Sequence, residues 1–275
     1  MKSPLVSVVI TTKNSKNDLP RLLSSLQSQS YPNLETIVVD NHSTDDTLTV
    51  AKRFTSKTFT RGPERSAQRN YGAKKAAGVY LLFLDSDMEL SPDVIKNCVE
   101  VIAANPTIGA VVVPEQSIGK RFWEQVKAFE RSFYETSLNS DIDSARFFSR
   151  QAFTQAGGYD EAVTGPEDWD LSESVRKNSG LVKISSPIYH HENIPSLRSQ
   201  AKKFYYYGLK SYRTLAKQNQ NAISPKTIPF LRPELYRQGS KLVAHPILSL
   251  GMTILLSCQI VAGGLGFIVG KFKRA

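Results

Sequence analysis

Short apolar runs alternate with longer segments of mixed polarity along the first 114 residues of the chain. The runs are rich in Val and Ile and end in polar residues, which is typical of strands buried on both faces. Between the first two runs, Leu recurs at positions 19, 22, 23 and 26, the spacing of one helix face. The predicted strands are residues 5–11, 34–40, 57–60, 79–84 and 108–114, and the predicted helices are residues 18–29, 44–54, 64–77 and 91–104.

Strands that alternate with helices at this spacing predict an α/β fold, with a mainly parallel central sheet that helices cover on both faces. Asp18 is the expected N-cap of the first helix, and Ser91-Pro92 is expected to start the fourth. Residues 121–135 carry aromatic side chains at helical spacing and predict a further helix with one aromatic face. That face is either ordinary core or the lining of an acceptor site for a lipid tail.

Polar side chains follow three of the predicted strands at the point where each strand ends. They are Thr11, Thr12, Lys13 and Asn14 after the first strand, Asp40 and Asn41 after the second, and Asp85, Ser86 and Asp87 after the fourth. A single Asp after a strand is usually a turn former or a helix cap. Ligands of open α/β sheets bind beyond the carboxyl ends of the strands, so we expect a binding site where these three ends meet.

The sequence Asp85-Ser86-Asp87 places two carboxylates two residues apart, directly after an apolar strand. Carboxylate oxygens are the ligands that Mg²⁺ and Mn²⁺ prefer, and these ions keep waters that a substrate can replace. The pair can therefore share one hard cation with a nucleotide diphosphate. Asp-x-Asp also occurs in many turns, so its position after the strand carries the interpretation.

Over residues 5–195, about 70% of its length, the chain resembles the family 2 glycosyltransferases of the GT-A fold. The resemblance rests on six motifs in a specific order: SVVITTKN (7–14), VVDNHSTDDT (38–47), ERSAQRNYG (64–72), LFLDSD (82–87), GGYDE (157–161) and GPEDWDL (165–171). It implies a GT-A fold and a nucleotide-sugar donor linked to UDP or GDP. It also implies transfer of the sugar with inversion, assisted by Mg²⁺ or Mn²⁺.

The resemblance assigns part of the donor site to the ends of the first two strands. Asp40 matches a carboxylate that accepts a hydrogen bond from the base or ribose, and Thr11 and Lys13 match a loop that lines the base pocket. Lys13 stands where the family often has an aromatic residue, so either base stacking is weaker or the lysine reaches a phosphate. Simple hydrogen bonding at the strand end explains Thr11 equally well.

Arg65 and Arg69 lie four residues apart on a predicted helix and share one face. Planar guanidinium groups suit the recognition of a diphosphate, although a solvated basic face is the alternative. Asn70 and Gly72 complete a family motif in which the glycine permits close backbone approach. We assign Arg69 to the donor first and Arg65 second.

Glu167 and Asp168 precede an amphipathic helix and match the acidic catalytic motif of the family. Inversion requires a carboxylate that takes the proton of the attacking acceptor hydroxyl. Asp168 is the candidate base, and Glu167 is assigned to the donor side. Capping of the helix N-terminus is the alternative role for both residues.

The resemblance further implies that a histidine completes the metal shell begun by Asp85 and Asp87. His190 and His191 both follow a short apolar segment, and His190 is preferred because it ends the predicted strand. A pair of exposed loop histidines is the alternative. The expected cofactor is Mn²⁺ or Mg²⁺.

Positive charge is concentrated near the end of the chain. Residues 1–197 hold 22 Lys and Arg against 24 Asp and Glu, whereas residues 198–275 hold 13 against the single acidic Glu234. Residues 198–217 also interleave lysines with tyrosines, which suits a helix at an anionic membrane surface. We expect a catalytic domain over residues 1–197 and a basic, membrane-associating segment over residues 198–275.

Residues 246–270 form an apolar run without a charged residue. As a helix the run would rise roughly 37 Å, enough to cross a bilayer core of about 30 Å. A buried core helix is the alternative, and three glycines leave a monotopic segment open. Positive residues flank both ends, among them Lys241 before the run and Lys271, Lys273 and Arg274 after it, so orientation is undecided.

Two classes of protein fit these observations. The first is a membrane-associated inverting glycosyltransferase on the cytoplasmic face of the plasma membrane, with a hydroxyl acceptor on a lipid-linked or cell-surface glycan. A polyprenyl-phosphate glycosyltransferase is its variant. The second is a non-catalytic membrane or nucleic-acid binding protein. The acidic residues of the motifs argue against this class, because a non-catalytic protein has no need to keep them in register. The adjoining apolar run favours membrane lipid over nucleic acid as the partner.

Two remaining features concern the compartment. The two cysteines, Cys98 and Cys258, lie far apart in unlike surroundings, so neither a disulfide framework nor a zinc cluster is expected. This suits a reducing compartment. The apolar stretch at residues 6–10 is too short for a signal peptide, so none is expected.

Overall fold

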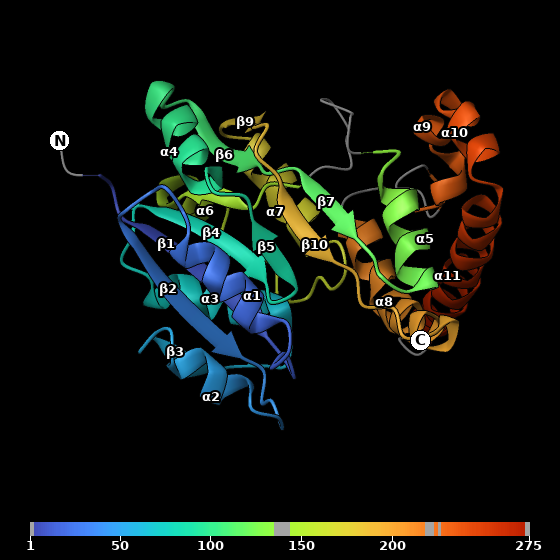
Figure 1. Ribbon diagram of the computed structural model, residues 1–275, viewed down its shortest axis with the longest axis horizontal. Coiled ribbons are helices and arrows are strands. Elements are labelled where there is room, and N and C mark those ends of the chain that lie inside the picture. Colours follow the sequence, from blue (N-terminus) through green and yellow to red (C-terminus); the bar gives the residue numbers. More distant parts are fainter. Residues whose placement is uncertain (1–2, 135–143, 218–222, 225–226, 273–275) are drawn as a thin grey trace. The chain divides into compact units, whose positions relative to one another are not determined.

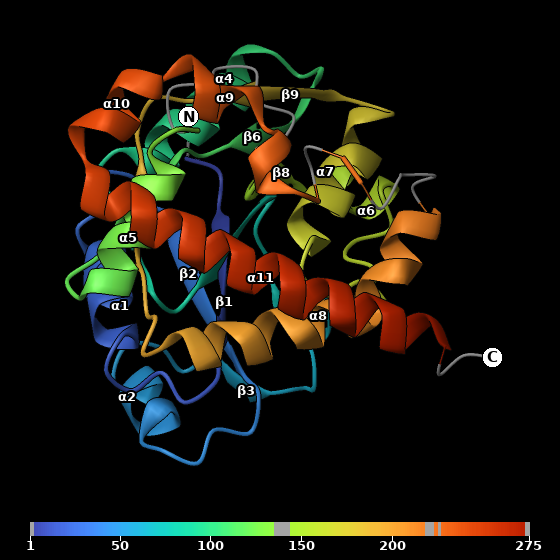
Figure 2. The ribbon, with the colours of Figure 1, turned by 90° about the vertical axis from the view of Figure 1, so that its right-hand side faces the viewer.

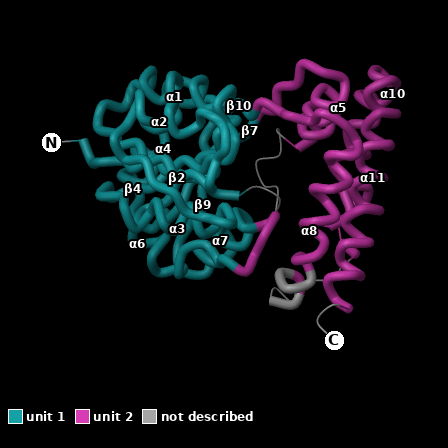
Figure 3. The backbone as a smooth tube through the Cα atoms, turned by 90° about the horizontal axis from the view of Figure 1, so that it is seen from below, with its two compact units in different colours: residues 1–115, 143–161, 167–190 teal, residues 116–142, 162–166, 191–275 magenta. Residues whose placement is uncertain are grey.

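The computed structural model describes residues 3–134, 144–217, 223–224 and 227–272 (Figure 1). The chain divides into two compact units (Figure 3). Unit 1 comprises residues 1–115, 143–161 and 167–190, and unit 2 comprises residues 116–142, 162–166 and 191–275. Each unit is therefore built from segments that are distant in the sequence.

Unit 1 contains a seven-stranded sheet in the order β3-β2-β1-β4-β8-β6-β9 (Figure 1). Its strands are β1 (Val6–Thr12), β2 (Leu34–Asp40), β3 (Thr58–Thr60), β4 (Tyr80–Asp85), β6 (Ile108–Val112), β8 (Phe147–Ser149) and β9 (Gly180–Lys183). β1 is parallel to both β2 and β4, whereas β8 is antiparallel to its neighbours β4 and β6. The predicted α/β fold with a mainly parallel sheet is confirmed.

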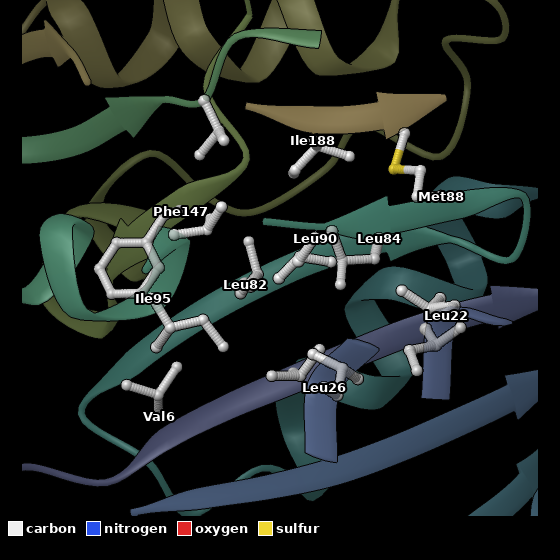
Figure 4. Packing of buried hydrophobic residues seen from close by; sticks show 14 of the residues in the cluster. Val6, Leu22, Leu26, Leu82, Leu84, Met88, Leu90, Ile95, Phe147 and Ile188 are labelled. Atoms are coloured by element: carbon white, nitrogen blue, oxygen red, sulfur yellow. The ribbon is translucent and has the colours of Figure 1, made fainter. Parts of the chain in front are cut away.

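Helices cover both faces of this sheet. They are α1 (Leu19–Gln27), α2 (Thr47–Lys52), α3 (Arg65–Lys75), α4 (Val94–Ala104), α6 (Arg150–Gln155) and α7 (Glu167–Arg176). Successive side chains of a strand point to opposite faces, so each buried strand feeds two cores. Val8 and Ile10 of β1 join the core under α1 and α4, and Val9 joins the core under α3, α6 and α7. Figure 4 shows Leu22 and Leu26 of α1 in the first of these cores.

The sequence pattern predicted the starts of several helices incorrectly. α2 begins at Thr47 instead of residue 44, because Asp45 instead accepts hydrogen bonds from the backbone N–H and hydroxyl of Thr47. α4 begins at Val94, three residues after Ser91. Asp18 stands at the N-cap of α1 but makes no side-chain capping bond, and its carboxylate lies 3.9 Å from Arg21.

A second, three-stranded sheet has the order β5-β10-β7, with β5 (Met88–Leu90), β7 (Glu115–Ile118) and β10 (Ile188–His191). β10 runs antiparallel to β5 and pairs His190 with Met88. This pairing brings the end of a strand that is late in the sequence beside Asp87. The short strands β5, β7, β8 and β9 and helix α6 were not predicted, because elements of three to six residues carry too little periodicity.

Apart from the ends of β7 and β10, the regular elements of unit 2 among the described residues are helical. Its elements are α5 (Phe122–Arg131), α8 (Leu197–Lys217), a 3₁₀ turn (Pro229–Leu231), α9 (Pro233–Arg237), α10 (Gly239–Ala244) and α11 (Pro246–Phe272). The predicted aromatic helix ends at Arg131, and Glu135 lies outside the described residues. Phe129 and Phe133 are buried in a core that Leu255 and Leu256 of α11 complete. This part of the aromatic face is therefore core, whereas Phe122 at the start of α5 is 43% exposed.

Helices α8 and α11 lie side by side (Figure 2) and approach closely through glycines. A Cβ atom at Gly208 would lie 2.2 Å from the carbonyl oxygen of Gly263, and one at Gly266 would lie 2.2 Å from that of Tyr205. A Cβ atom at Gly270 would likewise lie 2.3 Å from the carbonyl oxygen of Leu209. Only a residue without a Cβ permits this backbone contact.

Candidate active site

The predicted phosphate-binding helix presents two arginines to a group of carboxylates in unit 1. The side chain of Arg69 is fully buried, and its Nη2 and Nη1 atoms donate to Asp85 Oδ1 at 2.9 Å and Asp168 Oδ1 at 2.8 Å. Arg65 is partly exposed, with Nη2 3.1 Å from Glu167 Oε1 and Nη1 3.8 Å from Asp85 Oδ2. The structure thus brings together five of the predicted site residues.

Residues of two further motifs hold α3 against the loop that contains Tyr159 and against the sheet. Asn70 accepts a hydrogen bond from the Tyr159 backbone N–H at 2.9 Å and donates to the Tyr159 carbonyl at 2.8 Å. Gly158, which adopts φ +73°, leads the chain into this contact. Gly72 lets α3 approach the sheet, since a Cβ there would lie 2.3 Å from Val9. Arg69 is thereby held 5.0 Å from the centre of the Tyr159 ring.

Arg146 also joins this group, and the sequence did not predict it. It is 6% exposed, its Nε donates to Glu115, and its Nη1 lies 3.6 Å from Asp168 Oδ2 and 3.8 Å from Asp85 Oδ2. The residue precedes β8, the antiparallel strand inserted between β4 and β6. No motif marks it, so only the sheet order could have revealed it.

We call this set the arginine cluster; its members are Arg65, Arg69, Arg146, Asp85, Tyr159, Glu167 and Asp168. Burial would raise the pKa of Asp85, but Arg69, Arg65 and Arg146 hold it well below its usual range. Burial and the Asp168 carboxylate raise the pKa of Tyr159, so its hydroxyl is neutral and donates to Asp168 Oδ1 at 3.1 Å. Asp168 is therefore held by the side chains of Arg69, Tyr159 and Arg146.

A second set, the histidine cluster, consists of Asp87, Glu115 and His190. His190 Nε2 lies 3.2 Å from Asp87 Oδ2, and its Nδ1 lies 3.5 Å from Glu115 Oε2. Burial alone would lower the pKa of His190, but the adjacent carboxylates of Asp87 and Glu115 raise it to about 10. His191 follows on β10, where successive side chains point to opposite faces. His190, the preferred histidine, is the one placed beside Asp87.

The two clusters differ in the buried atoms that lack a hydrogen bond within the described part of the chain. In the arginine cluster these atoms are nitrogens, Arg69 Nε and Arg146 Nη1. In the histidine cluster they are Asp87 Oδ1 and His190 Nδ1. Buried polar atoms are nearly always paired, so these exceptions indicate what each cluster can still bind.

The carboxylates and the histidine of the two clusters fit a divalent cation in part. Among the described residues, no three His, Cys, Asp or Glu side chains are arranged to hold a metal ion together. Asp87 and His190 nevertheless offer a carboxylate oxygen and an imidazole nitrogen in contact, of the type that Mn²⁺ binds. Asp85 Oδ1 instead receives hydrogen bonds from Arg69 and from Thr11, the latter at 3.0 Å. Asp87 therefore fits a cation as it stands, whereas His190 fits one once its imidazole has released a proton.

The remaining predicted donor residues lie at the ends of β1 and β2. Asp40 is fully buried and accepts hydrogen bonds from Thr12 Oγ1 at 2.8 Å and from the Ser43 backbone N–H at 2.7 Å. Lys13 is exposed. Thr11 contacts the arginine cluster through Asp85, whereas no described contact joins Asp40 or Lys13 to that cluster.

Residues 7–156, more than half of the chain, match the sequence family Glycosyl transferase family 2. The chain is 27% identical over 196 residues to an uncharacterized glycosyltransferase of Haemophilus influenzae, covering 67% of each protein. It is 26% identical to the O-antigen biosynthesis protein RfbC of Myxococcus xanthus over 85% of this chain and 20% of RfbC. It is 34% identical to the GalNAc(5)-diNAcBac-PP-undecaprenol beta-1,3-glucosyltransferase of Campylobacter jejuni, over 32% of this chain and 31% of that protein. The chain thus spans only a fifth to a third of these last two relatives.

Solved structures give the same fold. The mannosyltransferase PcManGT of Pyrobaculum calidifontis, in complex with GDP-Man and Mn²⁺, aligns with a TM-score of 0.62 and 17% identity over 100% of this chain and 89% of that one. Residues 1–349 of S. aureus TarS, in complex with UDP-GlcNAc, align with a TM-score of 0.55 and 17% identity over 98% of this chain and 91% of that one. At this level of identity the similarity establishes the fold.

Proposed function

The chain belongs to glycosyl transferase family 2 and is a glycosyltransferase, and we propose that it moves a sugar from a UDP- or GDP-linked donor to an acceptor hydroxyl with inversion. The complexes of PcManGT with GDP-Man and of TarS with UDP-GlcNAc support a nucleotide-sugar donor. The undecaprenol-linked substrate in the name of the Campylobacter relative supports a lipid-linked or cell-surface glycan as the acceptor.

The observation that carries this proposal is the contrast between the unpaired atoms of the two clusters. Unpaired guanidinium nitrogens in the arginine cluster suit an anion such as the donor diphosphate. An unpaired carboxylate oxygen beside an imidazole in the histidine cluster suits a cation. Glu115 contacts both clusters, through Arg146 on one side and His190 on the other. The anion site and the cation site are therefore adjacent, as a metal–diphosphate complex requires.

In this proposal Asp87 and His190 hold Mn²⁺ or Mg²⁺, together with Asp85. The ion, when bound, neutralises the charge that develops on the departing nucleoside diphosphate. Arg65, which is 39% exposed, binds the diphosphate, and Glu167 orients it through their 3.1 Å ion pair. The fully buried Arg69 supports the donor site by holding Asp85 and Asp168 in place. Thr11, Lys13 and Asp40 contribute to the nucleoside side of the donor site.

Asp168 is the proposed general base. Its carboxylate is 18% exposed, so an acceptor hydroxyl can reach it, whereas Arg69 beside it is fully buried. Tyr159 and Arg69 both donate to Oδ1, which fixes the carboxylate plane. Base action then falls to Oδ2, which takes the proton of the acceptor hydroxyl as the sugar is transferred.

The proposal also covers where in the cell the reaction takes place. We propose that residues 198–275 attach the catalytic domain, residues 1–197, to the cytoplasmic face of the plasma membrane. α11 supports this, because among the described residues it is the one helix long and apolar enough to cross a membrane, with a mean hydropathy of 2.0. Nucleotide sugars on that face would then meet a lipid-linked acceptor.

The experiment that tests the proposed reaction uses the purified full chain with a panel of UDP- and GDP-sugars. Release of the nucleoside diphosphate is measured with Mn²⁺ and with EDTA, and the anomeric configuration of the product is read by NMR. We expect metal-dependent release from at least one donor and an inverted product. Absence of release from every donor, or a retained configuration, would contradict the proposal.

A further inference from the structure

Helix α11 exposes a continuous apolar stripe, which we call the outer stripe. Its members are Ile247, Leu250, Ile254, Val261, Leu265, Ile268 and Phe272, between 43% and 73% exposed. They recur three, four or seven residues apart and therefore lie on one face of the helix. Such a face, unbroken by any charge over the length of α11, marks an interaction surface.

The opposite face of α11 is occupied within unit 2. Leu255 and Leu256 are buried against α5, and Gly266 and Gly270 contact the backbone of α8. Near the middle of the helix, the buried Gln259 donates a hydrogen bond to Gln200 of α8 at 3.3 Å. α11 is thus an amphipathic member of a helical unit, with one side committed to protein.

The helix packed along α11 is cationic. Arg198, Lys202 and Lys203 of α8 are exposed, and Lys210 lies over the ring of Tyr206. The side chains of Tyr212, Arg213 and Lys217, together with Lys273 and Arg274, lie outside the described residues. If α11 crossed a bilayer, its glycine contacts would carry α8 and these cations into the hydrocarbon, which is strongly unfavourable.

We propose that α11 lies in the plane of an anionic membrane, with the outer stripe in the boundary between headgroups and acyl chains and both helix ends on the same side. The cations of α8 then remain at the level of the headgroups, where they attract anionic lipid. Residues 198–275 hold 13 Lys and Arg against one Glu, so two copies of this face would repel each other. Anionic lipid is therefore the occupant. The inference rests on the membrane association proposed above, and its test separates the two.

The first test asks on which side of the membrane each end of α11 lies. Ala244→Cys and Lys271→Cys, both at exposed positions outside the outer stripe, are made singly in a Cys258→Ser background. Inverted membrane vesicles from expressing cells are then treated with a membrane-impermeant maleimide. We expect both positions to react to a similar extent before detergent is added. Reaction of one end only after detergent would overturn the in-plane position while leaving membrane association intact. Absence of the chain from the membrane fraction would overturn both.

The second test uses purified full chain in flotation with phosphatidylcholine vesicles, with and without about 30% phosphatidylglycerol. We expect binding mainly to the anionic vesicles, and a loss of about tenfold or more for Val261→Glu. The matched control is Val79→Glu in unit 1, because Val79 is 53% exposed and Val261 is 61% exposed. Equal binding of the two variants would overturn the proposal, as would a soluble dimer that Val261→Glu dissociates. Nucleoside diphosphate release measured in the same samples separates a failed membrane surface from a failed enzyme.

Discussion

The arginine cluster and the histidine cluster are both buried and both rich in carboxylates, yet they differ in what they lack. Each carboxylate of the arginine cluster contacts at least one guanidinium group, and the unpaired atoms are nitrogens. The histidine cluster has two carboxylates for one imidazole, and Asp87 keeps an unpaired oxygen. The first is therefore a preformed network that can accept an anion, whereas the second is short of positive charge. This difference teaches which half of the site would hold the metal ion in the proposed reaction.

The largest expected effect is on stability in the arginine cluster. Arg69→Ala removes a fully buried cation and leaves Asp85 and Asp168 short of a partner, so the free energy of unfolding should fall by about 3–5 kcal/mol. Arg65→Ala is the matched control, because Arg65 is 39% exposed and should cost about 1 kcal/mol or less. Urea unfolding of both variants measures the difference, and equal losses would contradict a preformed network centred on Arg69.

The next effect concerns turnover. Asp168→Asn should lower kcat about 100-fold or more, because positioned proton transfer is lost, while donor affinity changes little. Steady-state kinetics with the donor found in the panel provide the measurement. Glu173→Gln, on the same helix but paired with Arg176 at the surface, is the control and should retain turnover. Near wild-type turnover of Asp168→Asn would exclude it as the base and would favour a phosphate acceptor.

The smallest expected effect is a pH dependence in the histidine cluster. The pKa of His190 is raised to about 10, so the protonated form stabilises the metal-free fold. This contribution is fully present below about pH 6.5 and is lost as the pH rises through 10. Urea unfolding in EDTA from pH 6 to 10 should show wild type losing stability relative to His190→Gln. Parallel curves for the two proteins would contradict the charged state of His190.

The sequence predicted the fold better than it predicted the site. Apolar runs such as residues 34–40 coincide with β2, because strands buried on both faces carry a strong hydrophobic signal. The same signal fails for β8, which has three residues and is inserted antiparallel in the sheet.

Within the site, the motifs identified seven members of the two clusters, namely Arg65, Arg69, Asp85, Asp87, Glu167, Asp168 and His190. Arg146 and Glu115 could not be found, because they reach the clusters only through the pairing of strands that are distant in the sequence. Their roles depend on tertiary contacts that no local spacing encodes.

The most direct test of the account is calorimetric titration of UDP and GDP into wild type and Asp87→Ala, with and without Mn²⁺. Asp87 holds the unpaired carboxylate oxygen of the histidine cluster, so its removal deletes a cation ligand and leaves the arginine cluster in place. We predict that Mn²⁺ strengthens binding of at least one nucleotide to wild type and has no such effect on Asp87→Ala. Equal strengthening by Mn²⁺ in both proteins would contradict the metal-assisted donor site.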